Sequence, residues 1–279
     1  MTESSAAITK SSGSNLAFTF ALLPKKVRNG MVVYYAFCRV VDDIADDPQN
    51  PVDLKLRQLT EWRAEIGRCY ARQAQTPLGR DLQKLITDVP SIPRDYFEEL
   101  INGVEMDLSI TRYKTFDELY RYCYRVASVV GLTSIEIFGC TDPKSRPYAI
   151  ELGQALQLTN ILRDIKKDAE NDRVYLPAEV LAQFAVTEAD LFQARESEGY
   201  FKMMDFLSEK AEGYYTRAVE NLTPTDKPRL IAAEMMRFVY HDLLVTLRRQ
   251  HYPSLRKTIS LSKARKLQLM CKAWIHSKF

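Results

Sequence analysis

The sequence predicts an all-α fold, a single helical bundle around a central cavity. Long stretches follow the helical repeat of apolar and polar residues, and they are interrupted mainly at prolines, which begin or end helices. The chain of 279 residues has only 10 glycines, few for a β-rich or doubly wound protein. It has no Gly/Ser-rich linker and no internal repeat, so we expect one folded domain.

The proline breaks set the predicted helices in order. The breaks fall at Pro24, Pro48 to Pro51, Pro77, Pro90 to Pro93, Pro143 to Pro147, Pro177, Pro224 to Pro228 and Pro253. The periodicity between them predicts helices at 25–47, 53–73, 78–88, 94–109, 115–139, 144–169, 178–184, 187–194, 199–221, 227–250 and 260–276. Residues 1–14 are small and polar, so we expect a flexible N-terminus that leaves 15–279 as the domain.

Two pairs of aspartates stand four residues apart, and an arginine precedes each pair. They are Arg39-x-x-Asp42-Asp43-x-x-Asp46 and Arg163-Asp164-x-x-x-Asp168. Residues four apart lie on one face of a helix, so each pair presents its oxygens together. Like charges at this spacing destabilise a helix by about 0.2–0.5 kcal/mol per pair, which a bound cation would offset. A solvated acidic helix end explains one such run, whereas two runs favour a metal site.

The second pair belongs to a polar stripe on an otherwise apolar helix. The stripe advances by three or four residues through Gly153, Gln157, Asn160, Asp164 and Asp168. An apolar helix is buried, so its polar face must line a cavity or leave its groups without partners. The first helix repeats this pattern with Tyr35, Arg39, Asp42 and Asp46 on one face. We infer that the two helices form opposing walls of one site.

The clustered carboxylates predict a Mg²⁺ and polyphosphate site. Mg²⁺ takes oxygen ligands, often one or two carboxylates together with phosphate oxygens and water. The expected ligands are Asp42, Asp46, Asp164 and Asp168, with Asp43 assisting. The 3 histidines and 5 cysteines show no paired spacing for zinc. A two-carboxylate glycosidase fits less well, because it needs one acid and one base rather than clustered aspartates.

Three motifs follow one another along the chain. They are Arg39-Val-Val-Asp42-Asp43-Ile-Ala-Asp46, Tyr122-Cys-Tyr-Arg125-Val-Ala-Ser128-Val-Val-Gly131, and Leu152-Gly153 through Gln157-Leu-Thr-Asn160-Ile-Leu-Arg163-Asp164-Ile-Lys-Lys-Asp168, ending in Arg173-Val-Tyr175-Leu-Pro177. Together they resemble the squalene/phytoene synthase family over nearly the whole chain. The resemblance implies a class I isoprenoid synthase fold and a catalytic domain at 15–279 that joins two prenyl diphosphates head to head.

Within that family, the chain looks most like the bacterial presqualene diphosphate and squalene synthases. The stretch Gly103-Val-Glu-Met-Asp107-Leu, the pair Arg112-Tyr113, and Arg125 with Ser128 carry this likeness. Phytoene synthases more often have an aromatic residue and a glycine at the last two positions. The loop Ser12-Gly-Ser-Asn-Leu16 departs from the Ser-x-Ser-Phe turn of many family members, so no N-terminal ligand is carried over.

Further roles are expected for polar residues beside the aspartates. Arg39 and Arg163 are candidate diphosphate clamps, or they pair with neighbouring aspartates. Gln157 and Asn160 would bind a diphosphate or order water, or else join two helices by a hydrogen bond. Three tyrosines match family positions that line the reaction centre, where an aromatic ring stabilises a cation: Tyr35, Tyr122 and Tyr240.

A groove for a prenyl tail is expected along the helix of the second motif. Val126, Ala127, Val130 and Gly131 fall on one side of it, and Phe18 and Phe20 would add a wall. Core packing explains the valines equally well. Gly131 is more telling, because a glycine inside a helix costs about 1 kcal/mol against alanine and marks the close approach of another group.

The C-terminal segment is basic. No acidic residue follows Asp242, while nine lysines and arginines do. The apolar residues of the segment include Leu267, Leu269, Met270, Ala273 and Trp274. The segment is either an end helix with a solvated basic face or a contact with an anionic membrane surface. No recognition motif supports a nucleic-acid partner, and the net charge is only +3.

No apolar run reaches about eighteen residues, and the N-terminus lacks a signal-peptide layout. We expect a cytoplasmic protein, peripheral at the inner membrane face if the basic segment binds lipid, and a monomer.

Three functions stay open. The favoured one is Mg²⁺-dependent condensation of two farnesyl diphosphates to presqualene diphosphate, with NADPH if the reaction continues to squalene. The second is phytoene or dehydrosqualene synthesis. The third is a non-catalytic, membrane-associated assembly factor, against which the presence of every motif aspartate argues. The chain has no G-x-G-x-x-G fingerprint, so the sequence itself does not indicate NADPH.

Overall fold

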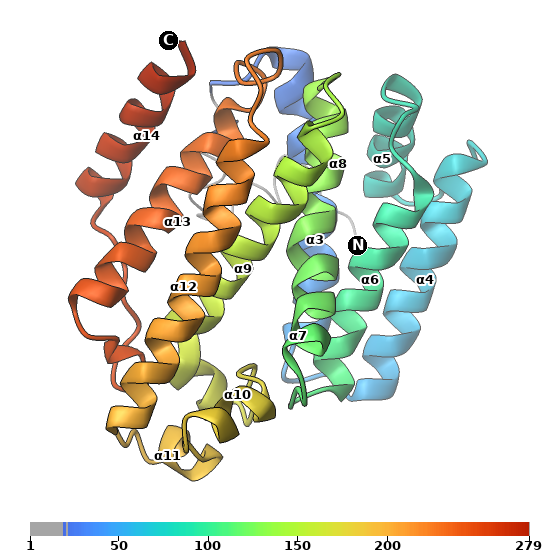
Figure 1. Cartoon of the computed structure of the whole chain (residues 1–279). Coiled ribbons are helices and arrows are strands. Elements are labelled where there is room, and N and C mark those ends of the chain that lie inside the picture. Colours follow the sequence, from blue (N-terminus) through green and yellow to red (C-terminus); the bar gives the residue numbers. More distant parts are fainter. Residues whose placement is uncertain (1–18, 21, 279) are drawn as a thin grey trace.

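A computed structural model describes residues 19–20 and 22–278 of the protein (Figure 1). These residues form helices joined by turns, with one isolated bridge between Arg112 and Val174. The predicted all-α fold is confirmed. The segment 1–14, the Ser12–Leu16 loop and Phe18 lie outside the described residues, so the expectations for them stay predictions.

The helices follow the predicted order. They are α3 (Lys25–Asp46), α4 (Val52–Tyr70), α5 (Pro77–Asp88), α6 (Arg94–Ser109), α7 (Phe116–Cys123), the π-helical segment η1 (Tyr124–Ser128), α8 (Val129–Phe138), α9 (Ser145–Glu170), α10 (Ala178–Gln183), α11 (Glu188–Phe192), α12 (Glu198–Glu220), α13 (Ile231–Arg249), the 3₁₀ turn η2 (Pro253–Leu255) and α14 (Lys263–Lys278). Among the described residues, no helix is both long and apolar enough to cross a bilayer.

Prolines and hydroxyl side chains set most helix starts. Helices α3, α4, α6 and α10 each begin directly after a proline, whose fixed φ suits the position before a helix. Four other helices begin after a residue whose hydroxyl accepts a hydrogen bond from the N–H three positions on: Thr76, Thr115, Thr187 and Ser197. These local signals explain why the predicted starts of these eight helices agree with the structure to within one residue. The helix predicted at 260–276, which has no such signal at residue 260, begins only at Lys263.

The start of the helix predicted at 227–250 is wrong, because α13 begins only at Ile231 and turns precede it. Asp226 in those turns is fully buried. Its carboxylate accepts hydrogen bonds from the backbone N–H groups of Thr141 and Asp142 and from the Ser145 hydroxyl, each at 2.8 Å. The side chain thus ties its own segment to the loop that precedes α9 and to the first residue of that helix.

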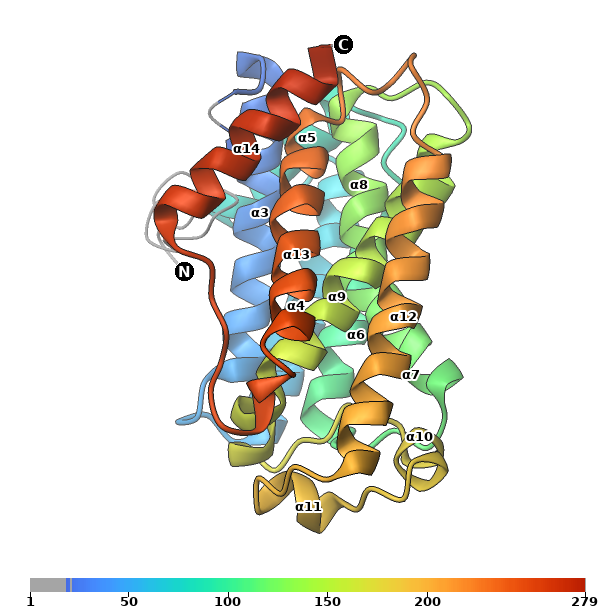
Figure 2. The same cartoon turned by 60° about the vertical axis from the view of Figure 1, so that its left-hand side comes forward.

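Helix α9 runs through the middle of the bundle (Figure 1). It packs against α12, α13, α8 and η1, while α3 packs against α4, α5, α6 and α8. Short helices α10 and α11 lie at the end of the bundle that the C-terminal end of α9 reaches (Figure 2). Helix α14 packs on α13 at the outside of the bundle in both views.

The single helix predicted over 115–139 consists of α7, η1 and α8. Two glycines make room for the backbone of η1. A Cβ atom at Gly153 of α9 would lie 2.5 Å from the Cα atom of Ser128, and one at Gly103 of α6 would lie 2.8 Å from Val126 Cγ1. The π-helical turn is therefore held between α6 and α9, and its side chains face directions that a regular helix would not give.

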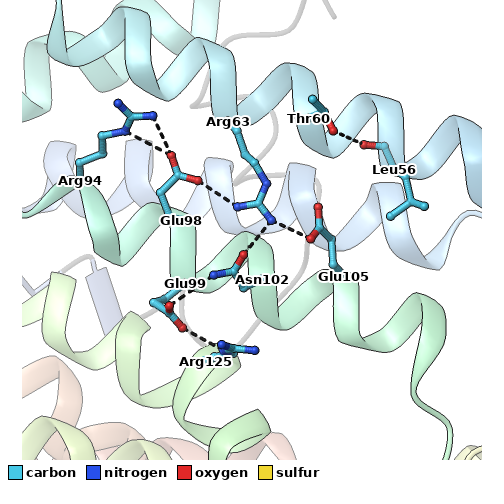
Figure 3. A network of polar contacts seen from close by, with 9 residues as sticks. All are labelled: Leu56, Thr60, Arg63, Arg94, Glu98, Glu99, Asn102, Glu105 and Arg125. Atoms are coloured by element: carbon cyan, nitrogen blue, oxygen red, sulfur yellow. Dashed lines mark hydrogen bonds and ion pairs between the residues drawn. The ribbon is translucent and has the colours of Figure 1, made fainter.

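Ion pairs fix η1 and α4 to α6 (Figure 3). Arg125 of η1 donates to Glu99 of α6 at 2.9 Å. Arg63 of α4 donates to three acceptors on α6, namely Glu98 at 2.9 Å, Asn102 at 2.8 Å and Glu105 at 2.7 Å. Ser128 donates to the carbonyl oxygen of Ile150 in α9 at 2.8 Å. Arg125 and Ser128, the residues that suggested one branch of the family, therefore bear on the packing of η1.

We expect Gly153→Ala to lower the free energy of unfolding by about 1–3 kcal/mol, the range for overpacking a well-packed core. The new methyl group would meet backbone atoms, which cannot move aside as a flexible side chain can. Gly213→Ala in α12 is the matched control, because its Cβ would meet only the end of Arg217 at 3.3 Å. That substitution should stabilise by about 0.5–1 kcal/mol. Urea unfolding of both variants measures the difference, and equal effects would contradict the close approach.

Candidate active site

Three helices bring aspartates to one end of the bundle. Asp42 and Asp46 lie in the last turns of α3, Asp164 and Asp168 in the last turns of α9, and Asp107 near the end of α6. Burial is the main cause of the raised pKa of Asp42 and of Asp168, and the charge of Asp107 is a smaller cause that acts on both. The two predicted pairs are therefore close enough to act on a common neighbour, which supports the expectation of two walls facing one site.

The site holds more negative charge than its surroundings compensate. Asp42 is open to water on one side, but enclosing protein atoms desolvate it, and with the charge of Asp46 this raises its pKa to about 7. Desolvation and the charge of Asp164 raise the pKa of Asp168 to about 7 as well. Burial also raises the pKa of Asp107. A bound cation would favour the ionised form of all three carboxyl groups.

The oxygen-rich donor set fits Mg²⁺. In the described chain, no three carboxylate, histidine or cysteine side chains lie close enough to chelate an ion by themselves. Mg²⁺ retains water and takes phosphate oxygens, so one or two aspartates on each wall suffice when a diphosphate is present. The buried Oδ1 atom of Asn160 has no hydrogen-bond partner among the described residues, and Asn160 stands one helical turn before Asp164 on the polar stripe of α9. The ligand roles of Asp42, Asp43, Asp46, Asp164 and Asp168 stay predictions.

These pKa shifts predict a loss of stability as the pH rises. The folded protein holds protons on Asp42 and Asp168 that the unfolded chain, with a value of 3.8, releases earlier. Their contribution to stability is thus complete below about pH 4 and is lost as the pH rises through about 7. Without Mg²⁺, we expect the wild-type Tm to fall more between about pH 5 and pH 8 than that of Asp168→Asn, which lacks one of the two groups. Differential scanning fluorimetry measures the Tm at each pH. An equal fall of the Tm in wild type and variant would contradict repulsion among these carboxylates.

Both arginines pair with aspartates. Arg39 donates a hydrogen bond to Asp43, four residues later in α3. The guanidinium of Arg163 donates to both carboxylate oxygens of Asp164, with Nε 2.8 Å from Oδ1. The hydroxyl of Tyr240 also interacts with Arg163. The pairing alternative is thus present in the structure, and a clamp on diphosphate would add to it. Asp43 is exposed and pairs with Arg39, and Asp164 pairs with Arg163 in the same way.

The amide residues of the stripe are partly buried. Within the part of the chain that the structure describes, neither Gln157 nor Asn160 forms the helix-to-helix hydrogen bond considered for them. That bond is made by Gln154, which donates to the carbonyl oxygen of Tyr120 at 3.2 Å and to Ser128 at 3.4 Å. Binding of diphosphate or water by Gln157 and Asn160 stays a prediction.

A tyrosine cluster around Asp107 was not predicted. Tyr122 donates to Asp107 at 3.0 Å, and Tyr175 donates to it at 2.8 Å. The two rings are stacked with centroids 5.2 Å apart, and Tyr113 lies 5.6 Å from Tyr122. Arg173 donates to the backbone carbonyl oxygen of Asp107 at 2.9 Å. All belong to motifs quoted above, but only tertiary structure makes them one group.

An apolar cavity of about 120 Å³ lies deeper in the bundle. Four predicted groove residues are among those that line it, namely Phe20, Ala127, Val130 and Gly131. Val126 is not, because the π-helical turn directs it toward Gly103 of α6. Tyr35 contacts Phe20 edge-on, with centroids 6.1 Å apart. On α9, residues 156 in the cavity wall and 164 in the acidic site are separated by about 12 Å.

Gly131 has a packing role beside the cavity. A Cβ atom there would lie 2.9 Å from the carbonyl oxygen of Ala149, so the group that approaches Gly131 is the backbone of α9. A large residue at this position would disturb packing whether or not a prenyl tail binds. Phe138 is a better probe of the cavity, because it lines both this cavity and a second hollow of about 1050 Å³ between α3, α5 and α8.

Comparison with known proteins gives the site its context. The family model for squalene/phytoene synthases matches residues 9–265. The chain belongs to the squalene/phytoene synthase family. It is therefore a prenyltransferase of the family that joins two prenyl diphosphates head to head, and the family is generally Mg²⁺-dependent.

Individual relatives fall in more than one branch. A presqualene diphosphate synthase from Rhodopseudomonas palustris is 34% identical over 260 residues, covering 92% of each chain. A phytoene synthase from Arthrospira platensis is also 34% identical, over 83% of this chain and 78% of that protein. Among solved structures, a dehydrosqualene synthase in complex with a ligand has a TM-score of 0.86 at 28% identity, over 98% of this chain and 95% of the other. A squalene synthase from Alicyclobacillus acidocaldarius has a TM-score of 0.82 at 28% identity, over 89% and 93%.

Proposed function

We propose that this member of the family condenses two farnesyl diphosphates to presqualene diphosphate. The observation that carries the proposal is the placement of an apolar cavity next to two aspartate-bearing walls that share Asp107. The acidic end suits a diphosphate with bound Mg²⁺, and the apolar cavity suits part of its prenyl chain. The similarity to the R. palustris presqualene diphosphate synthase over nearly the whole of both chains supports the product.

The reaction begins when one farnesyl diphosphate loses its diphosphate and becomes an allylic cation. Mg²⁺ held by Asp42, Asp46, Asp164 and Asp168 would neutralise charge on the leaving group. Arg39 and Arg163 would add donors to phosphate oxygens. Orientation of two flexible chains is the demanding requirement, and the preformed cavity supplies part of it.

The 2,3 double bond of the second farnesyl diphosphate then attacks C1 of the cation. Loss of one proton closes the cyclopropane ring, so the balanced products are presqualene diphosphate, one diphosphate and one proton. The ring of Tyr122 would stabilise the cation, with Tyr35 and Tyr240 as further candidates. Asp107, bonded to the hydroxyls of Tyr122 and Tyr175, would take up the proton, since burial raises the pKa of its carboxyl group.

Product analysis tests the proposal. Purified protein is incubated with farnesyl diphosphate and Mg²⁺, with and without NADPH, and in parallel with geranylgeranyl diphosphate. Presqualene diphosphate from the farnesyl substrate without NADPH is the expected result. Squalene formed only with NADPH would add a reductive step to the same function. Phytoene from the geranylgeranyl substrate alone would overturn the proposal in favour of the phytoene synthase alternative, which the A. platensis relative keeps open.

The position of Phe138 at the cavity suggests how the length of the prenyl substrate is selected. Phe138 separates the 120 Å³ cavity from the larger hollow, so Phe138→Ala should join the two. We expect the ratio of kcat/KM for geranylgeranyl over farnesyl diphosphate to rise about tenfold. Because Phe→Ala in a core costs about 3–5 kcal/mol, Phe138→Leu serves as a milder second variant.

Ile137→Ala is the matched control for this change. Ile137 is the adjacent buried residue and lines only the larger hollow of the two. Its substitution should lower stability without changing the substrate ratio. An unchanged substrate ratio in both Phe138 variants would contradict a role of Phe138 in selecting the length of the prenyl substrate.

A further inference from the structure

Helix α14 presents apolar side chains to solvent. Leu269, Met270 and Ala273 are buried and form the face that packs on α13. The opposite face carries Leu267, which is 50% exposed, together with Trp274 at 45% and Ile275 at 54%. In the sequence, Leu267 and Trp274 belong to the same apolar set as the three buried residues. In the structure, about half of each side chain is exposed to solvent.

Basic residues accompany this outward face. Lys263 and Lys272 are exposed, and Lys266 is partly buried. Arg265 bonds to Asp242, with Nε 3.0 Å from Oδ2, and Asp242 is the last acidic residue of the chain. No carboxylate side chain therefore belongs to α14 itself. Apolar side chains interspersed with cations are the pattern of a helix that lies in a membrane interface.

Helix α13 connects α14 to the wall of the apolar cavity. Lys272 lies over the ring of Phe238 in α13 at 5.8 Å, and the ring of His276 lies 5.9 Å from the same phenylalanine. The preceding turns of α13 carry Ala232, Ala233 and Met236, which line the cavity. Figure 2 shows α14 crossing the outside of the bundle, away from the end that α10 and α11 cover.

We infer that the outward face of α14, formed by Leu267, Trp274 and Ile275 with Lys263 and Lys272, binds the surface of an anionic lipid bilayer. Charge decides the occupant, because a second copy of this chain would oppose the same cations in a two-fold interface. A bilayer of neutral lipid would meet the apolar residues but not the lysines. Binding itself does not depend on the proposed function. The purpose of this binding would be to release a long apolar product from the cavity into lipid. That purpose rests on the proposed function.

Tryptophan fluorescence gives a direct readout. The chain has 2 tryptophans, and Trp62 is only 3% exposed, so a change on adding vesicles reports Trp274. With the full chain and vesicles of phosphatidylglycerol and phosphatidylcholine, we expect a blue shift of emission and co-sedimentation of the protein. Vesicles of phosphatidylcholine alone should bind at least tenfold less.

Two variants distinguish binding through this face from nonspecific adsorption to vesicles. Ile275→Glu should weaken vesicle binding at least tenfold, whereas Val219→Glu, the same kind of change at a 44% exposed position on α12, should not. Circular dichroism checks that both are folded. Absence of wild-type binding, equal binding to neutral vesicles, or equal loss in both variants would overturn the inference. So would a dimer in light scattering that Ile275→Glu dissociates. Vesicle binding with no turnover would instead count against the proposed function alone.

Discussion

Asp42→Asn and Asp164→Asn are each expected to lower kcat with farnesyl diphosphate by about 10²–10³-fold, the range for losing one preorganised contact to developing charge. The two residues stand on opposite walls, so a large effect from both requires one site that uses the two helices together. Asparagine keeps the shape of aspartate and removes its charge. Because Asp42 is repelled by Asp46, its replacement should also raise the Tm above neutral pH while turnover is lost.

Asp47→Asn is the matched control for these variants. Asp47 directly follows α3, and its carboxylate accepts hydrogen bonds from the backbone N–H of Gln49 at 2.9 Å and from Asn50 at 2.7 Å, which are local turn contacts. This change should leave kcat within about a factor of two, as for a surface substitution away from the site. Full turnover by Asp42→Asn with an unchanged circular dichroism spectrum would remove Asp42 from the site.

The second large effect is expected at Asp107, whose charge acts on an aspartate of each wall, Asp42 and Asp168. Asp107→Asn should lower kcat by about 10²-fold, as expected for loss of a proton acceptor. Its charge raises the pKa of Asp42 and Asp168, so the acid limb of the pH–rate profile should move to lower pH in the variant. The pH–rate profile of wild type and variant at saturating Mg²⁺ measures the shift.

Glu105→Gln distinguishes this effect from simple destabilisation of α6. Glu105 stands two residues earlier and accepts from Arg63 on the side of α6 that faces α4 (Figure 3). Its replacement should lower the Tm and leave the acid limb where it is. If Asp107→Asn also lowers the Tm without moving the limb, Asp107 is a structural partner of Tyr122 and Tyr175 and no more.

Local patterns were enough to predict the fold class and the two aspartate pairs. Residues four apart in a helix share a face whatever the helix packs against, and a proline directly before a helix marks its start wherever the chain lies. The apolar surroundings of the stripe from Gly153 to Asp168 also indicated an inward face. These features depend on a few neighbouring residues, so they can be predicted without knowledge of the tertiary structure.

The features that were missed depend on contacts between distant segments. Asp107 is one acid among many in the sequence, and its place between the walls follows only from the packing of α6. The π-helical turn of η1 needs Gly103 and Gly153 from two other helices, and it turns Val126 out of the expected groove. On α14, both sides carry apolar residues, so the sequence could not indicate which side packs on α13.

The ratio of diphosphate released to farnesyl diphosphate consumed tests the central claim most directly. With Mg²⁺ and without NADPH, condensation that ends at presqualene diphosphate releases one diphosphate for every two substrates, and EDTA should abolish it. The account predicts this ratio, together with its loss in Asp42→Asn and Asp164→Asn alike. One diphosphate for every substrate would contradict a reaction that ends at presqualene diphosphate. Release that persists in either variant would contradict a single ionising site formed by the two aspartate-bearing helices.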